Sequence, residues 1–309
     1  MHVSNSRNVL KGKITYVYIL AVLSMILWGM SFVWTTIVFR YYPPIATVFI
    51  RLVISFILLY TGILIFRKAE TIKRKDIPMF LASAGLNPFL YFLGESYGLK
   101  MTSSTISAVV ITTIPLFTPI VAYFTLKEKL TKLNIIGIFI SFSGIILMII
   151  NRDMTFNATP MGIGLLLFAV ASAVGYSVFL KKLTLRYSAL TIISTQNLIG
   201  ALYFLPLFLI FDWGAFISVK PDAKLVSSIL ALAVFCSTLA YVFFTIATRE
   251  LGVNKTNVFS NLIPVFTGIF SYFILGELFT IQKILGMMVV VFGLYLSQIK
   301  KSPTVVYSG

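Results

Sequence analysis

The chain has 309 residues, of which 59% are hydrophobic and only 11% are charged. An average soluble domain has about 25% charged residues, so this chain has too few charges to cover the surface of a water-soluble globule. The composition therefore excludes a soluble enzyme, a disordered chain and a nucleic-acid-binding domain. It predicts a protein that lies mostly in lipid, and the net charge of +16 fits this, because Lys and Arg gather in the cytoplasmic loops of membrane proteins.

Residues for catalysis or metal binding are scarce. The only histidine is His2, and the only cysteine is Cys236, which lies in an apolar run. Histidine acid–base chemistry, a histidine metal site and an intramolecular disulfide are excluded on these counts. The ATP-binding pattern G-x-x-x-x-G-K-[ST] does not occur. We predict that the protein is not an enzyme and holds no metal or cofactor.

Ten apolar stretches follow one another along the chain, each near the roughly 20 residues that a helix needs to cross a bilayer. They lie at 15–37, 44–66, 77–98, 104–126, 132–150, 160–180, 191–212, 225–248, 256–276 and 281–299. The first is too long for the apolar region of a signal peptide and lacks a small-residue cleavage site, so we expect it to be retained. The predicted fold is an all-α integral membrane protein with ten transmembrane helices.

The distribution of positive charge predicts the orientation. Ten spans put both termini on one side of the membrane, and most of the Lys and Arg residues in the loops fall on that same side, including Arg67–Lys75 and Lys181–Arg186. Because positive loops stay in the cytoplasm, we expect both termini to be cytoplasmic. The predicted location is the cell (inner or plasma) membrane.

The two halves of the chain match each other. A shift of 149 residues aligns Pro115 with Pro264, Phe117 with Phe266, Tyr123-Phe124 with Tyr272-Phe273, Glu128 with Glu277, Gly137 with Gly286 and Gly144 with Gly293. A shift of 146 aligns Arg40-Tyr41 with Arg186-Tyr187. The halves, 15–150 and 160–299, would each hold five spans. An odd number of spans inverts the second half relative to the first, as in many secondary transporters.

These motifs resemble a known family. The runs P-L-F-T-P from Pro115 and P-V-F-T-G from Pro264, each followed by an acidic residue near its span end, are similar to the EamA repeat of the drug/metabolite transporter superfamily. W-G-x-S-F at 28–32 is similar too, whereas Lys127 departs from the Gly expected where the second half has Gly276. The resemblance implies a ten-helix fold with a central cavity between the halves, the fifth and tenth spans at the periphery, and small metabolites or drugs as substrates.

Two charged residues are predicted inside spans. A charge in the bilayer costs at least roughly 2.5 kcal/mol, so intramembrane charges are functional candidates. Glu95 could bind a substrate amine or carry a proton, and Arg51 could bind a substrate carboxylate or pair with Glu95. The alternatives to a functional role are that Glu95 is hydrated near the outer end of its span, and that Arg51 forms a structural ion pair or extends its side chain to the lipid headgroups.

Further cavity candidates lie in the spans that the resemblance places around the cavity. Pro115 and Pro264 are expected in mid-helix, where each frees a backbone carbonyl that could bind substrate, or produces a static kink. Thr112 and Asn261 lie close before them. The other candidates are aromatic or small polar residues that either touch the substrate or pack in the core: Trp28, Ser31, Trp34, Tyr91, Tyr176 and Tyr241.

Other repeated residues have predicted structural roles. Glu128 and Glu277 fall at helix ends, where we expect them to cap helices or anchor loops. The pair Gly137 and Gly144 and the pair Gly286 and Gly293 are spaced to let helices approach closely, within the chain or in a dimer. The polar pair Gln196-Asn197 is expected to bond to other helices.

The sequence thus predicts a secondary transporter with alternating access that exports a small organic metabolite such as an amino acid. A multidrug or cation efflux protein of the same fold is the alternative, and a membrane enzyme or receptor fits less well. The expected partners are the substrate, the bilayer and protons as a candidate coupling ion, without nucleic acid. The protein would be a monomer or a homodimer.

Overall fold

The computed structural model describes residues 2–117, 132–149, 158–278 and 280–298. These residues form helices and turns and contain no strand. The longer helices are α1 (His2–Val38), α2 (Pro44–Ile65), α7 (Lys132–Ile149), α8 (Pro160–Thr184), α9 (Ala189–Leu207) and α15 (Ile281–Gln298). The shorter helices are η1 (Arg74–Asp76), α3 (Ile77–Ala84), η2 (Gly85–Leu90), α4 (Tyr91–Lys100), α5 (Ser104–Ile111), η3 (Phe208–Asp212), α10 (Trp213–Ser218), α11 (Ala223–Ala231), η4 (Leu232–Ala240), α12 (Tyr241–Leu251), α13 (Val253–Val258), η5 (Phe259–Leu262), α14 (Ile263–Phe270) and η6 (Ser271–Leu275).

The all-helical fold is confirmed over the described residues. Among them, seven helical stretches are long and apolar enough to cross a membrane, and three further apolar helices are shorter. The seven are Ile14–Val38, Pro44–Ile65, Arg74–Lys100, Pro160–Thr184, Ala189–Ser218, Ala223–Leu251 and Lys255–Leu275. The shorter ones are Ser104–Phe117, Ile135–Ile149 and Ile281–Leu296. Ten spans therefore stay a prediction.

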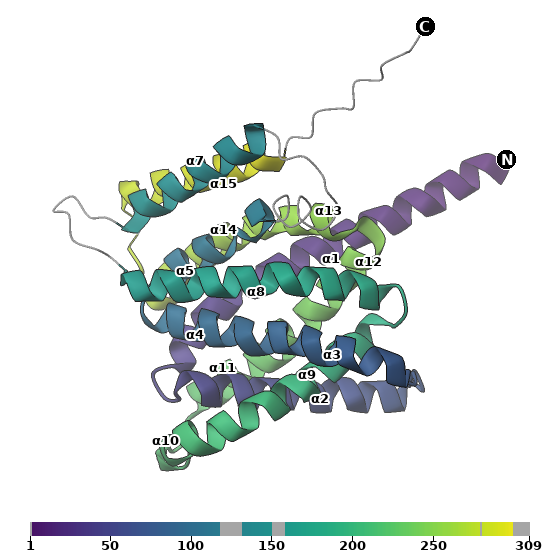
Figure 1. Ribbon diagram of the computed structural model, residues 1–309, viewed down its shortest axis with the longest axis horizontal. Coiled ribbons are helices and arrows are strands. Elements are labelled where there is room, and N and C mark those ends of the chain that lie inside the picture. The colour runs from purple at the N-terminus through teal and green to yellow at the C-terminus, as the bar shows by residue number, and fades with distance from the viewer. Residues whose placement is uncertain (1, 118–131, 150–157, 279, 299–309) are drawn as a thin grey trace, which may run out of the picture.

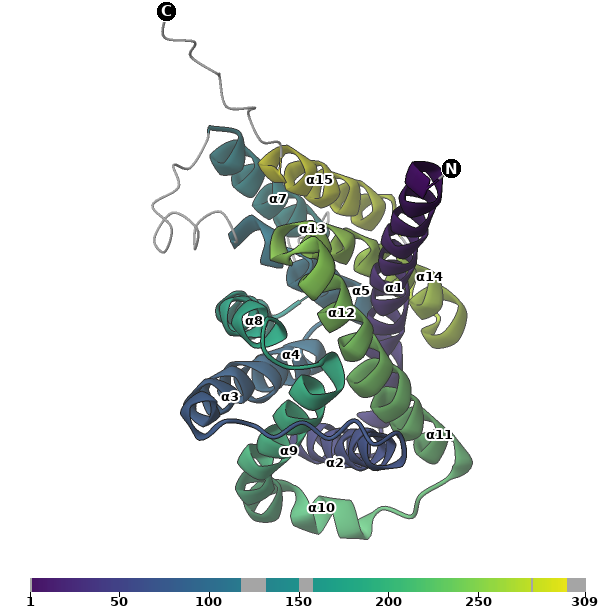
Figure 2. The same cartoon turned by 90° about the vertical axis from the view of Figure 1, so that its right-hand side faces the viewer.

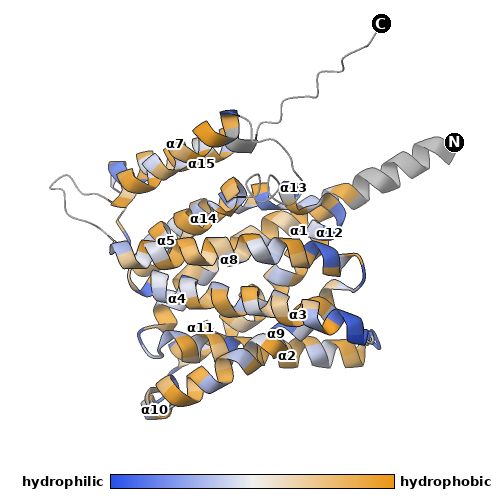
Figure 3. Cartoon of the chain, in the orientation of Figure 1, coloured by the Kyte–Doolittle hydropathy of each residue, from blue (hydrophilic) through white to orange (hydrophobic). Residues whose placement is uncertain are grey.

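Helices from the two halves of the sequence interleave. α1 packs against α12 and α14, α2 against α9, and α4 against α8. The pair α7 and α15 lies at the edge of the bundle in both views (Figures 1 and 2). Apolar residues run along the helices, and hydrophilic residues gather at the right-hand end, where α3 begins and α8 ends (Figure 3). A bundle built this way brings residues from distant parts of the sequence into one interior.

Small residues set the closest helix contacts. A Cβ atom on Gly144 of α7 would lie 2.7 Å from the carbonyl oxygen of Gly286 in α15, and one on Gly286 would lie 2.8 Å from that of Gly144. Gly94 meets α8 in the same way, since its Cβ would lie 2.6 Å from the carbonyl oxygen of Leu165. Without side chains the backbones can touch, which is how small residues bring membrane helices together. Gly144 and Gly286 are thus used within the chain.

One span is broken where the cavity described below lies, and another begins beside it. Between α3 and α4, Asn87 has an extended backbone (φ −142°, ψ 119°). The following residue is Pro88, and the residue before a proline is disfavoured in the helical conformation. In the second half, Gly252 has a positive φ of 85°, ends α12 and separates the stretch Ala223–Leu251 from the stretch Lys255–Leu275, which begins with α13 and η5.

The two prolines lie inside helical stretches, each next to a local irregularity. Pro264 is the second residue of α14 and directly follows the 3-10 segment η5, within the stretch Lys255–Leu275. Pro115 follows a turn at Thr112 and Thr113 that ends α5, within the stretch Ser104–Phe117. A tighter turn inside a long helix often marks strain or a hinge. The role of the two prolines in binding or gating stays a prediction.

Glu277 caps a helix of the other half. Its Oε1 accepts a hydrogen bond of 3.0 Å from the backbone N–H of Ser104, and its Oε2 accepts one of 2.6 Å from the Thr105 hydroxyl. These donors lie at the N-terminus of α5, where a negative charge is favourable. This contact fits the capping role predicted for Glu277. Its repeat partner Glu128 lies outside the described residues.

We expect Gly94→Ala to lower the free energy of unfolding by about 1–3 kcal/mol, because the new methyl group overpacks the contact between α4 and α8. The matched control is Gly164→Ala in α8, where an added Cβ meets nothing within 4 Å. Thermal unfolding of the purified protein in detergent measures both. Equal melting temperatures for the two variants would contradict the close contact.

Candidate functional site

A cavity with about 700 Å³ of empty volume, including the part open to solvent, lies between helices of both halves. The cavity is lined by Trp28, Ser31, Phe32, Arg51, Asn87, Tyr91, Phe92, Glu95, Ile111, Ile114, Ala173, Tyr176, Ser177, Tyr241, Phe244, Asn257, Ser260 and Ile263. The broken span contributes Asn87 to this wall, and the start of the span Lys255–Leu275 contributes Asn257 and Ser260.

Arg51 enters the cavity from α2. Its side chain is 2% exposed, and its Nε donates a hydrogen bond of 2.7 Å to the Ser237 hydroxyl in η4. The guanidinium carbon lies 4.6 Å from the centre of the Phe92 ring, which attracts a cation through its π face. A neutral acceptor and an aromatic ring thus hold the charge in place, and among the described residues no carboxylate lies within 4 Å of it.

Glu95 faces the same cavity from α4 and is 8% exposed. Its Oε1 accepts a hydrogen bond of 2.8 Å from the hydroxyl of Tyr91, one helical turn earlier on the same face. No ion pair within 4 Å joins Glu95 to Arg51 in the described part of the chain. The cavity therefore contains one buried acid and one buried base that share space without closing on each other.

Aromatic rings form much of the remaining wall. The ring of Trp28 lies edge-on to Tyr241 at 5.0 Å and tilted against Phe244 at 4.9 Å, measured between centroids. The Tyr241 hydroxyl donates to Asn87 Oδ1 at 3.2 Å, so it is tied to the broken span of the first half. The rings give the cavity an apolar face and hold the two halves together at this point.

The polar groups at the start of the span Lys255–Leu275 are less well satisfied. Asn257 in α13 lines the cavity and is 3% exposed, yet its Nδ2 has no hydrogen-bond partner. Asn261 Oδ1, in η5, also lacks a partner. A buried polar group without a partner costs about 1–3 kcal/mol. Asn257 is therefore a donor that a bound molecule can satisfy.

The structure brings seven of the twelve predicted site residues to the cavity wall. These are Trp28, Ser31, Arg51, Tyr91, Glu95, Tyr176 and Tyr241. The other five, Trp34, Thr112, Pro115, Asn261 and Pro264, are not among the lining residues. Trp34 stacks on Phe235 at 6.0 Å, and the Thr112 hydroxyl bonds to the carbonyl oxygens of Ala108 and Ser260.

Eleven of the 18 wall residues were not among the predicted site residues, and two of them, Phe92 and Asn257, bear on the chemistry of the cavity. Phe92 follows Tyr91 directly and places its ring against the Arg51 guanidinium. Asn257 precedes the candidate Asn261 by four residues, and this helical spacing is the signal that could have found it. Neither residue stands out by composition alone.

Polar groups inside other spans bond between helices, as predicted for Gln196-Asn197. Gln196 donates from Nε2 to the Ser83 hydroxyl at 2.7 Å and accepts from the Tyr176 hydroxyl at 3.2 Å. Asn197 donates from Nδ2 to the Ser55 hydroxyl at 2.7 Å. These bonds tie α9 to α2, α3 and α8, so the pair supports the cavity wall from behind.

Known proteins resemble the chain over nearly its whole length. The uncharacterized transporter YetK of Bacillus subtilis (strain 168) is 27% identical over 253 residues, which is 81% of this chain and 76% of the relative. An uncharacterized transporter of Archaeoglobus fulgidus is 26% identical over 279 residues, 90% of this chain and 97% of the relative. A solved structure described only as the crystal structure of a protein superposes with a TM-score of 0.68 at 17% identity, over 92% of this chain and 96% of the other, which shows a shared fold.

Residues 15–150 and 160–298 match the EamA-like transporter family. This match covers most of the chain and confirms the resemblance found in the sequence motifs. The family and the relatives' names point to a transporter rather than an enzyme. The chain belongs to the EamA-like transporter family and is a multi-pass membrane transporter of a small molecule.

Proposed function

We propose that the protein is a secondary transporter that exports a small zwitterionic metabolite, such as an amino acid, across the cell membrane by alternating access. One observation carries the proposal: Arg51 and Glu95 are buried in one cavity, and no ion pair within 4 Å joins them among the described residues. A molecule with both an ammonium group and a carboxylate complements that arrangement.

The charges favour such a ligand for an energetic reason. A charge taken out of water is stabilised only by an opposite charge and by hydrogen bonds. Arg51 can bind a carboxylate through two parallel N–H groups, and Glu95 can accept hydrogen bonds from an ammonium group. The aromatic wall around Trp28 and Tyr241 would hold the apolar part of the metabolite. In this proposal Asn257 Nδ2 gives a further hydrogen bond to the bound carboxylate.

Alternating access follows from the proposed architecture. We take 15–150 and 160–298 as two five-span halves of opposite orientation, with ten spans in all and both termini in the cytoplasm. Binding at the interface of inverted halves is the pattern of many secondary transporters. The five predicted residues outside the cavity wall, Trp34, Thr112, Pro115, Asn261 and Pro264, are proposed to contact substrate or bend when the halves exchange conformations.

The monomer is the proposed transport unit. The close approach of Gly144 and Gly286 is used between α7 and α15 of one chain. That leaves the small-residue faces occupied, which favours a monomer over a homodimer built on the same faces.

Efflux of lipophilic cations is the second candidate function. The aromatic rings of the cavity attract cations, and Glu95 adds a negative charge. Arg51 opposes this function, because a buried guanidinium repels a cationic drug in the same cavity. The two functions therefore differ in what they require of Arg51.

The first test is ligand binding to the purified protein in detergent. An amino acid present at a free concentration of 100 times its Kd stabilises the folded state by about 2.7 kcal/mol and so raises the melting temperature. We expect some member of a panel of the twenty amino acids to do so, and both Arg51→Gln and Glu95→Gln to abolish the shift. Lys220→Gln, on an exposed loop, is the matched charge control. A shift given by lipophilic cations alone, lost in Glu95→Gln but kept in Arg51→Gln, would support the second candidate instead.

The second test concerns protons. If Glu95 carries the coupling proton, Glu95→Gln abolishes uptake driven by a pH gradient into proteoliposomes, because glutamine cannot titrate. Counterflow of substrate without a gradient, measured in the same vesicles, shows whether the variant still binds and moves substrate. Gradient-driven uptake that equals that of the unchanged protein would remove Glu95 as the proton carrier.

A further inference from the structure

Each half of the chain carries an Arg-Tyr pair and, further on, an aspartate. Asp222 follows Asp76 by 146 residues, the shift that also separates Arg40-Tyr41 from Arg186-Tyr187. The aspartates are thus part of the internal repeat. Their hydrogen bonds cross between the halves: Tyr187 of the second half bonds to Asp76 of the first, and Tyr41 of the first bonds to Asp222 of the second.

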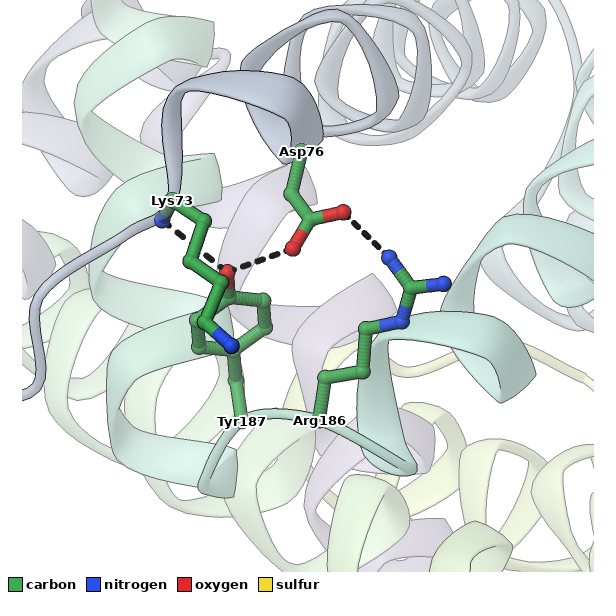
Figure 4. Close-up of polar contacts among 4 residues, drawn as sticks. All are labelled: Lys73, Asp76, Arg186 and Tyr187. Carbon is green, nitrogen blue, oxygen red and sulfur yellow. Dashed lines mark hydrogen bonds and ion pairs between the residues drawn. The ribbon is translucent and has the colours of Figure 1, made fainter.

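The first crossing, which we name the Asp76 contact, is shown in Figure 4. The Tyr187 hydroxyl donates to Asp76 Oδ2 at 2.7 Å, and Arg186 forms an ion pair with Oδ1 of the same carboxylate. The backbone N–H of Lys73 donates to the Tyr187 hydroxyl at 3.1 Å. The Asp76 side chain is 2% exposed, so this carboxylate is buried under the groups that bind it.

The second crossing, the Asp222 contact, has the same core and less around it. The Tyr41 hydroxyl donates to Asp222 Oδ2 at 2.7 Å in an exposed setting. Asp222 Oδ1 accepts from the backbone N–H of Leu225 at 2.7 Å and so caps α11. That N–H and the Tyr41 hydroxyl hold the pKa of Asp222 below its ordinary value, which keeps the carboxylate charged. No ion pair to Asp222 occurs within the described residues.

The two contacts lie at opposite ends of the bundle. In Figure 1, α8 ends and α3 begins on the right, whereas α1 ends and α11 begins on the left. The central cavity is formed by helices that run between these ends, including α1 and α8. Each contact therefore joins the two halves on one side of the cavity.

We propose that the Asp76 and Asp222 contacts are matched closures of the two ends of the cavity, and that transport breaks one while the other holds. The proposal rests on the alternating access proposed above. Because the bonds cross between the halves, rotation of one half against the other must break a contact at one end and can preserve its counterpart at the other. The ion pair between the half-exposed Arg186 and the buried Asp76 is an interaction that the Asp222 contact lacks among the described residues, and it makes the Asp76 contact the stronger closure.

Sided labelling of the cavity tests this. In a Cys236→Ala background, Ser177→Cys places a single thiol on the cavity wall, and a membrane-impermeant maleimide reports its access from each side of the membrane. We expect Tyr187→Phe to raise the labelling rate about fivefold in inverted vesicles only, and Tyr41→Phe to raise it in intact cells only. A net hydrogen bond has about that effect on the ratio of two conformations.

Controls keep the result interpretable. Tyr42→Phe alters a tyrosine next to Tyr41 and leaves the Asp222 contact intact, so the labelling rates should not change. Arg186→Gln keeps the Tyr187 ring and weakens the Asp76 contact. It replaces Tyr187→Phe in the labelling experiment if that variant does not fold, with the same expected result. Rates that are unchanged, or raised equally from both sides, would overturn the proposal. The labelling needs no substrate, so a failed ligand panel does not affect it.

Discussion

The burial of charge and polar groups in lipid is the constraint on which this structure depends. The bilayer interior offers no water, so each polar group must find a partner inside the protein. Gln196 and Asn197 do so by bonding α9 to its neighbours, and Glu277 by capping α5. Arg51 and Glu95 differ, because hydroxyl groups bind them and no opposite charge within 4 Å, among the described residues, neutralises either. In the proposed function, a charged ligand relieves that residual cost.

The broken helices follow from the same constraint. A break frees backbone and side-chain polar groups, and such groups are tolerated at membrane depth only where protein or a cavity receives them. The break at Asn87 is closed by the Tyr241 hydroxyl from the opposite half. Asn257 Nδ2, in the span that begins after Gly252, is unpaired at the cavity. The polar groups at the break are therefore satisfied within the protein, whereas the start of the span Lys255–Leu275 presents an unpaired donor to the cavity.

The sequence predicted the charged part of the site better than the rest, for a physical reason. Arg51 and Glu95 stand out in apolar runs, and Tyr91 shares a helix face with Glu95. Trp34 does not line the cavity in this structure, and its ring packs on Phe235. The sequence could not predict this, because a helix that is apolar on all sides gives no periodic signal of which face turns inward. The positions of Asn257 and Phe92 at the cavity depend on where helices begin and end and on contacts between the halves. A local sequence pattern does not contain this information.

The internal repeat explains why the two ends of the bundle can be alike and yet unequal. In the proposed inverted arrangement, duplication gives both halves the same Tyr and Asp and puts one copy of the contact at each end of the cavity. The surroundings of the two copies differ, since Arg186 neutralises the buried Asp76, whereas Asp222 stays exposed and caps α11. Two identical contacts would contribute equally to the proposed outward-facing and inward-facing states. A difference between them sets a resting state, and it lets substrate charges in the cavity shift the balance, since a ligand moves an equilibrium only through its different affinity for the two states.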